Sequence, residues 1–445
     1  MRLPCKRTLG WIAIACLWGL PARAADLAGG VLLHGQVREG DRADSTEAPT
    51  NAYGVILAPN LHHGVGGETY FRLDRDWSRA DGASDFYLGF ARVPFRGLEL
   101  SLGRQLLDEV PGALYVADAG RLRVDRGGPL SFSLFGGQPR YFEPLRGPEI
   151  VSQDEQIFGG STRLRWLPLG QMVLTFAQLQ REQRRVNQLV GATWGRNFLN
   201  LPWRPQMYAL ATYDTAERNL QQATGGGGFA LHPRVFARVE ASYYKPSARS
   251  GTTLAGLDRF VDPLFSVFSV ASMRQARGGL QFQWRPTVYG SLDYAFQTFE
   301  ESPGKTVDGN RGSVGVTWLP EGDGLEWVRA EVAITDSRGG DLYALRGYYE
   351  NRVYQRILFR TKIEVAGFDK VTNESDTVVS GRMGVGYEFV RGLLVEVNFE
   401  GNRSPRFDQE FRLGFFVTYN AQYRNGRQAP AMERPVLRYP GGWAG

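Results

Sequence analysis

The sequence predicts an all-β protein, a single antiparallel β-barrel that spans a membrane with about 22 strands. Three observations support this prediction. Short stretches of alternating apolar and polar residues recur along the chain, four of them end in Trp-x-Pro, and short connections alternate with longer polar ones. Alternate side chains of a strand point to opposite faces, so each of these strands has one apolar face and one wet face.

The first 24 residues are predicted to be a secretory signal. A basic start precedes the apolar run LGWIAIACLWGL, and Ala-Arg-Ala at 22–24 is a small-residue cleavage site. This run is too short to cross a bilayer. Both cysteines, Cys5 and Cys16, lie in this segment, so we expect no disulfide and no cysteine-based metal or haem site in the remainder. A lipidated Cys16 is the alternative, but it would cut the apolar run in half.

Charge argues against a nucleic-acid partner. The signal carries four of the 52 basic residues and none of the 46 acidic ones, which leaves a net charge of +2 for the rest. Residues 25–423 are expected to form the barrel. Residues 424–445, which are rich in Pro, Gly and Arg, are expected to form a flexible periplasmic tail with either a passive or a partner-binding role.

The alternation locates the strands. In EFRLGFFVTYNAQY, Phe411, Leu413 and Phe415 interleave with Arg412 and other small or polar residues. Applied along the chain, the same pattern predicts strands near 28–38, 51–60, 66–76, 84–93, 97–106, 119–126, 129–138, 155–166, 170–182, 187–198, 206–215, 218–231, 233–246, 273–285, 287–300, 310–319, 324–336, 341–350, 353–367, 376–389, 392–402 and 410–423. Merging the hairpin at 341–367 would give the alternative of about 20 strands.

The connections favour a membrane barrel over a soluble β-sandwich or propeller. Proline marks a strand end, and tryptophan on the lipid side of a strand end is typical of a membrane-interface girdle. The girdle is predicted from Trp166, Trp203, Trp284 and Trp318. The longer connections are expected near 39–50, 108–118, 139–153, 247–271, 301–308 and 368–375. This asymmetry predicts an outer-membrane location, with the short connections in the periplasm and the long ones outside the cell.

The wet face is expected to line the lumen with mixed charge and much arginine. The predicted lumen-facing residues are Arg121, Arg123, Asp125, Arg163, Arg165, Arg238, Glu240, Arg329, Glu331, Arg360, Lys362, Glu364, Glu396, Glu400 and Arg412. Two interpretations stay open. The charges pair across strands and hydrate the lumen, or arginine rings favour anionic solutes.

One long connection is unusually apolar. The stretch RFVDPLFSVFSVAS contains Phe260, Leu264, Phe265 and Phe268. Exposed apolar clusters usually mark contacts. The segment is therefore expected to form a loop constriction in the pore, to contact a partner, or to extend a hairpin above the membrane.

Nothing in the sequence predicts an enzyme or a metal site. The four histidines are His34, His62, His63 and His232, and the paired ones lie at an expected turn without further ligands. The Gly225–Gly228 run is expected inside a strand, with no helix to complete a phosphate site. We expect no cofactor bound by this chain itself.

Residues 101–140 resemble a stretch of large outer-membrane barrels. In this sequence it reads SLGRQLLDEVPGALYVADAGRLRVDRGGPLSFSLFGGQPR, a Gly-Arg-Gln strand followed by a hairpin that ends in Phe-Gly-Gly. Similar stretches occur in porin–cytochrome conduit barrels and in alginate-export-like barrels. The conduit resemblance implies a barrel that sheaths a multihaem cytochrome encoded separately, because this chain has no CxxCH.

The sequence is therefore compatible with three functions. The first is a porin-like channel for small hydrophilic solutes. The second is the barrel sheath of an electron conduit with a multihaem cytochrome in the lumen. The third is a polysaccharide or other dedicated exporter. The channel predicts a water-filled, narrowed lumen, whereas the sheath predicts a lumen too wide to be selective.

Overall fold

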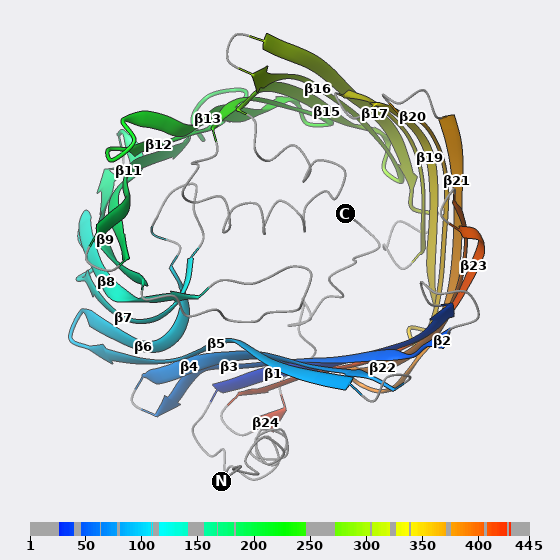
Figure 1. Ribbon diagram of the computed structural model, residues 1–445, viewed down its shortest axis with the longest axis horizontal. Helices are drawn as coiled ribbons and strands as arrows, with labels where there is room; N and C mark the ends of the chain where they lie inside the picture. The colour runs from blue at the N-terminus through cyan, green and yellow to red at the C-terminus, as the bar shows by residue number, and fades with distance from the viewer. Residues whose placement is uncertain are drawn as a thin grey trace.

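The chain forms one closed antiparallel barrel (Figure 1). The computed structural model describes residues 26–39, 46–62, 64–77, 81–107, 109, 115–140, 155–166, 168–181, 184–245, 272–302, 305–320, 326–337, 340–370, 375–404, 407–424 and 427–428. Within them, strands β1 and β23 pair along their lengths, from Leu27 opposite Tyr423 to Arg38 opposite Arg412, and this pairing closes the sheet. No helix in these ranges is long and apolar enough to cross a bilayer.

Twenty-two long strands build the wall, which confirms the prediction of about 22 strands. Of the 24 strands in the described ranges, β2 (Thr46–Glu47) and β24 (Arg427–Gln428) have two residues each. The others are β1 (Asp26–Glu39), β3 (Pro49–His62), β4 (Val65–Asp76), β5 (Asp81–Phe95), β6 (Leu98–Leu107), β7 (Tyr115–Asp125), β8 (Leu130–Arg140), β9 (Glu155–Trp166), β10 (Gly170–Arg181), β11 (Arg184–Asn197), β12 (Gln206–Asp214), β13 (Asn219–His232), β14 (Val235–Tyr244), β15 (Met273–Arg285), β16 (Val288–Ser302), β17 (Lys305–Trp318), β18 (Glu326–Ser337), β19 (Gly340–Val353), β20 (Ile357–Lys370), β21 (Ser375–Val390), β22 (Leu393–Ser404) and β23 (Phe407–Arg424).

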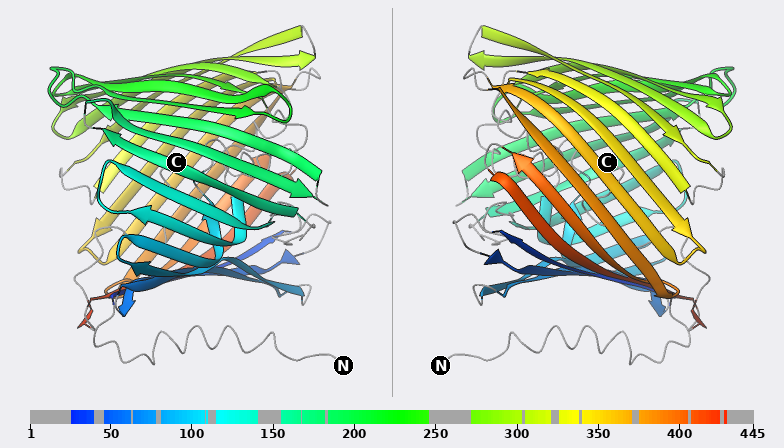
Figure 2. Two further views of the ribbon diagram at one scale, coloured as in Figure 1. Left: turned by 90° about the vertical axis from the view of Figure 1, so that its left-hand side faces the viewer. Right: turned by 90° about the vertical axis from the view of Figure 1, so that its right-hand side faces the viewer.

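Each long strand pairs with its sequence neighbours, and the strands run diagonally across the wall (Figure 2). The merged 20-strand alternative is wrong, because β19 and β20 are separate strands that pair from Gly340 opposite Lys370 to Val353 opposite Ile357. β1 begins and β23 ends at the same end of the barrel, the end that has the short connections. This is expected for an even number of strands.

Some predicted connections are shorter in the structure. β16 ends at Ser302 and β17 begins at Lys305, so the connection expected at 301–308 is wrong. The connection expected at 368–375 is shortened in the same way, since β20 continues to Lys370 and β21 begins at Ser375. The residues added to these strands are largely polar. Paired strands can continue beyond the apolar part of the wall. Both of their faces are then in water, so their residues no longer alternate between apolar and polar.

The two faces of the wall differ in chemistry. On β22, Val397 and Phe399 are 52% and 51% exposed on the outside, whereas Glu396 and Asn398 point inward and are buried. In a bilayer every backbone polar group needs an internal partner, which a closed barrel supplies. A large antiparallel barrel with an apolar exterior belongs in the outer membrane of a Gram-negative bacterium. The outward face of β23, including Phe411, therefore contacts lipid.

Candidate functional site: the barrel lumen

Strand register decides which side chains share the lumen. Glu331 on β18 lies opposite Arg346 on β19, which lies opposite Glu364 on β20. Their neighbours Val332 and Leu345 are exposed on the outer face. Because directly paired residues share a face, the same register places the remaining predicted lumen residues on this inward side of the wall.

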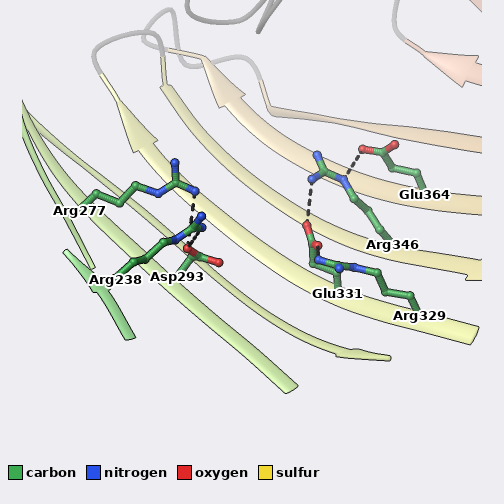
Figure 3. Close-up of polar contacts among 7 residues, drawn as sticks. All are labelled: Arg238, Arg277, Asp293, Arg329, Glu331, Arg346 and Glu364. Atoms are coloured by element: carbon green, nitrogen blue, oxygen red, sulfur yellow. Dashed lines mark hydrogen bonds and ion pairs between the residues drawn. The ribbon is translucent and has the colours of Figure 1, made fainter. Parts of the chain in front are cut away.

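Charges on β18–β20 form a chain of ion pairs (Figure 3). The Arg329 Nη2 atom is 2.6 Å from Glu331 Oε2, and Arg346 Nη1 is 3.3 Å from Glu331 Oε1. Arg346 also reaches Glu364 with its Nε atom, at 2.9 Å, and Lys362 Nζ is 3.0 Å from the other oxygen of Glu364. Each carboxylate therefore bridges two cations on neighbouring positions.

A second group lies on β12–β16. Asp293 accepts a hydrogen bond from Arg238 and forms an ion pair with Arg277 Nη2 at 3.5 Å (Figure 3). The Tyr208 hydroxyl donates to Glu240 on the same wall. These side chains are partly exposed to the lumen, so each pair contributes little to stability and mainly orients charge.

A third group lies on β19–β23. Arg360 bridges two carboxylates, with its Nε atom 2.9 Å from Glu350 and its Nη1 atom 3.0 Å from Glu396. Arg412 likewise contacts Glu410 at 2.7 Å and Glu400 at 3.4 Å. The Arg360–Glu396 and Arg412–Glu400 pairs join different strands, as the first interpretation expects, in which the charges pair across strands.

The N-terminal part of the wall repeats this chemistry. Asp125 is 2.8 Å from Arg165 Nη2 and 3.3 Å from Arg123 Nη2. Arg163 lies on the same inward face, opposite Ser131 of β8. The lumen face therefore carries mixed charge on the N-terminal strands as well as on β12–β23.

Three strand ends leave the wall and enter the lumen. β6 pairs with β5 only as far as Arg104, and β8 pairs with β9 only as far as Gly137, whereas β6, β7 and β8 stay paired with one another beyond these points. We call residues 105–107, 115–119 and 138–140 the tongue. In Figure 1 a cyan segment correspondingly lies inside the ring.

The tongue packs on the inward face of β9–β11. Leu107 and Tyr115 at its tip belong to one buried apolar cluster with Ile157, Leu179 and Leu189 of the wall. In this cluster the inward-facing side chains of the tongue pack on the inward-facing side chains of β9–β11. The tongue must therefore bend inward over these strands. Burial of such side chains is worth about 1.5–3 kcal/mol each, so the tongue is a seated element that narrows the lumen.

Polar contacts fix the tongue at its root and below its tip. Asp118 of β7 accepts hydrogen bonds from Arg104 of β6, at 2.7 Å, and from Arg140 of β8, at 2.5 Å, so one carboxylate joins all three strands. Glu109 follows the tip and lies in the lumen. It is 3.1 Å from Arg121 Nη1 and accepts a hydrogen bond from the Ser133 hydroxyl at 3.0 Å.

Alternation did not predict the tongue, although its signals are present in the sequence. Gly103, where β6 leaves β5, has a φ of +126°, and a Cβ there would lie 2.4 Å from the Gly89 carbonyl oxygen. Pro139 has no N–H to donate to a ladder, which is typical of an unpaired strand edge. Phe135 and Ile157 are apolar residues on an otherwise wet face, which indicates that something covers them.

The four tryptophans of the predicted girdle lie at or between strand ends. Trp166 and Trp318 are the last residues of β9 and β17, Trp284 precedes the last residue of β15, and Trp203 lies between β11 and β12. All four are at least half exposed and lie at the barrel end that has the short connections.

Several predictions concern residues outside the described ranges. These are the signal at 1–24, the loop residues Phe260, Leu264, Phe265 and Phe268, and most of the tail at 424–445. Of the histidines, His34 stacks on Phe416 in the lumen, with ring centroids 4.3 Å apart. Among the described residues no group of His, Cys, Asp and Glu is arranged to hold a metal ion.

Comparison with solved structures finds similar barrels at low identity. Pseudomonas aeruginosa OccK5 (OpdH) is 12% identical, with a TM-score of 0.46 over 90% of this chain and 98% of that one. Pseudomonas aeruginosa OpdQ is 10% identical, with a TM-score of 0.46 over 89% and 99%. Acinetobacter baumannii OccAB1 is 7% identical, with a TM-score of 0.39 over 89% and 96%. No protein-family model and no curated protein sequence match this chain.

Proposed function

We propose that this protein is an outer-membrane channel that passes small hydrophilic solutes through a mixed-charge, arginine-rich lumen. The observation that supports the proposal most is the tongue, because it narrows a charged lumen with the wall's own strands. Charged side chains that line a narrowed passage are the usual basis of selectivity in barrel channels.

The pairing of the charges refines the proposal. Arg346 lies between Glu331 and Glu364, and Arg360 between Glu350 and Glu396. Paired charges offer both donors and acceptors to a passing solute and add little net field. We therefore expect weak ion selectivity and a preference for polar solutes over apolar ones.

The electron-conduit alternative requires a wide lumen instead of a narrowed one. A sheath around a multihaem cytochrome needs free space across its whole width, whereas the tongue, seated by Leu107 and Tyr115, occupies part of it. This favours the channel over the sheath. We propose no catalytic step and no cofactor bound by this chain.

The test is permeation by the purified full-length barrel. In planar bilayers we expect steady conductance, with a reversal potential in a KCl gradient close to that of an unselective pore. In vesicles we expect swelling with small sugars and not with long oligosaccharides. An insulating barrel that copurifies in fixed ratio with a Soret-absorbing protein would refute the channel and favour the sheath.

A further inference from the structure

The lipid-facing wall is hollowed at one place. Gly225, Ala241, Ala276 and Phe296 lie side by side in register on β13–β16. Two adjoining depressions of about 720 and 480 Å³ share these four residues. Both volumes fall within the range of about 300–1,000 Å³ that is typical of ligand sites.

This hollow opens to lipid and not to the lumen. Val239 and Tyr294 on its border are each 53% exposed on the outer face. The alternate residues Glu240 and Arg277 lie on the inward face, where Glu240 accepts the Tyr208 hydroxyl hydrogen bond. We call this hollow, with its floor of Gly225, Ala241, Ala276 and Gly278, the outer groove.

The outer groove runs along β15 from the Arg274 side chain into the apolar part of the wall. The outward positions of β15 are Arg274, Ala276 and Gly278 in succession, and Phe296 and Tyr294 of β16 form the side of the groove. An acyl chain could lie along this line, because the small residues make room and the aromatic rings supply contact area.

Arg274 lies at the level of the outer-leaflet headgroups. β15 begins at Met273, after the connection at the end remote from the short turns, and Trp284 stands near its other end. Ten residues of a strand tilted by about 45° rise roughly 24 Å, close to the height of about 25 Å of an apolar band. If Trp284 marks the periplasmic interface, Arg274 marks the extracellular one.

A groove in the hydrocarbon region does not stay empty, because its lining loses dispersion contacts unless a chain or a partner fills it. A guanidinium at headgroup level binds phosphate with charge-assisted hydrogen bonds. We propose that the outer groove binds one molecule of lipid A, with a saturated acyl chain along Ala276 and Gly278 and a phosphate on Arg274. Lipid A is chosen because Arg274 faces the outer leaflet.

The test uses the full-length barrel in detergent, titrated with purified bisphosphorylated lipid A and observed by native mass spectrometry. We expect wild type to retain one lipid A. Replacing Arg274→Gln should weaken binding about tenfold, through loss of the charged contact. Replacing Gly278→Leu should abolish it, since a Cβ at this position meets no atom within 4 Å and the longer side chain would occupy the groove.

Two matched variants serve as controls. Gly347 is another outward glycine with open space around its Cβ position, and Arg403 is another outward arginine near the extracellular end of a strand. We expect Gly347→Leu and Arg403→Gln to bind lipid A as wild type does. Heat-modifiable migration on gels verifies that each variant is folded.

Three outcomes would overturn the proposal. Equal lipid A binding by wild type, Arg274→Gln and Gly278→Leu would place the lipid elsewhere. Phosphatidylglycerol that competes as well as lipid A would overturn the choice of lipid. A wild-type protein that binds no lipid A but forms dimers that Gly278→Leu disrupts would assign the groove to a second copy of this chain.

Discussion

Replacing Leu107→Ala should loosen the tongue. Leu107 is fully buried at the tongue tip, in one apolar cluster with wall residues that include Ile157 and Leu189. Truncating a buried leucine to alanine costs about 2–5 kcal/mol. Pairing with β5 does not offset this loss, because β6 is not paired with β5 beyond Arg104. At about 1.4 kcal/mol per tenfold change, the equilibrium constant for packing of the tongue on the wall falls by roughly thirty-fold to several thousand-fold.

The assay is single-channel recording in planar bilayers. Wild type should hold one conductance level, whereas Leu107→Ala should visit higher levels as the tongue leaves its seat. The matched control is Leu102→Ala, on the same strand but 54% exposed on the lipid face, which should conduct as wild type does. If Leu107→Ala and Leu102→Ala give the same unchanged conductance, the tongue does not limit the passage.

Three further changes test the lumen and the wall. Glu331→Gln should shift the reversal potential in a KCl gradient toward chloride, because two arginines lose their shared carboxylate; an unchanged potential would mean that these groups lie off the ion path. Gly103→Ala should lower the folded fraction after refolding into detergent, because its φ of +126° and a 2.4 Å backbone contact exclude a Cβ, whereas Gly381→Ala, with open space, should refold normally. Asp341→Asn should raise the urea midpoint of unfolding, since Asp341 lies directly opposite Asp336 and like charges in register destabilise a sheet by about 0.2–1 kcal/mol; a lower midpoint would contradict this.

Much of the wall could be predicted from local pattern. The predicted strands at 155–166 and 273–285 coincide with β9 and β15 to the residue. Alternation works here because lipid and water demand opposite chemistry on the two faces of each strand, so a shift of one residue would reverse every side chain. The signal weakens where both faces are wet. Residues 303–304 therefore separate β16 from β17, although the first of these strands was predicted to end at 300 and the second to begin at 310.

Partner choice within the lumen depended on register. The sequence indicates that Arg329, Glu331 and Glu364 share the wet face, but it does not say that Arg346 bridges the two carboxylates. Turn lengths and bulges set how far each strand slides along its neighbour, and these are tertiary properties. The same register aligns Ala241 with Ala276 and so creates the outer groove.

The sequence by itself determined the class of fold, and it predicted about 22 strands and a lumen face for the charges, because these follow from a period of two residues. Only the tertiary structure decided that β6, β7 and β8 leave the wall. Their inward bend depends on a buried cluster of residues far apart in the chain, which includes Leu107 and Leu189. An apolar residue on a wet face indicates that it is covered, but what covers it depends on the packing of the whole barrel.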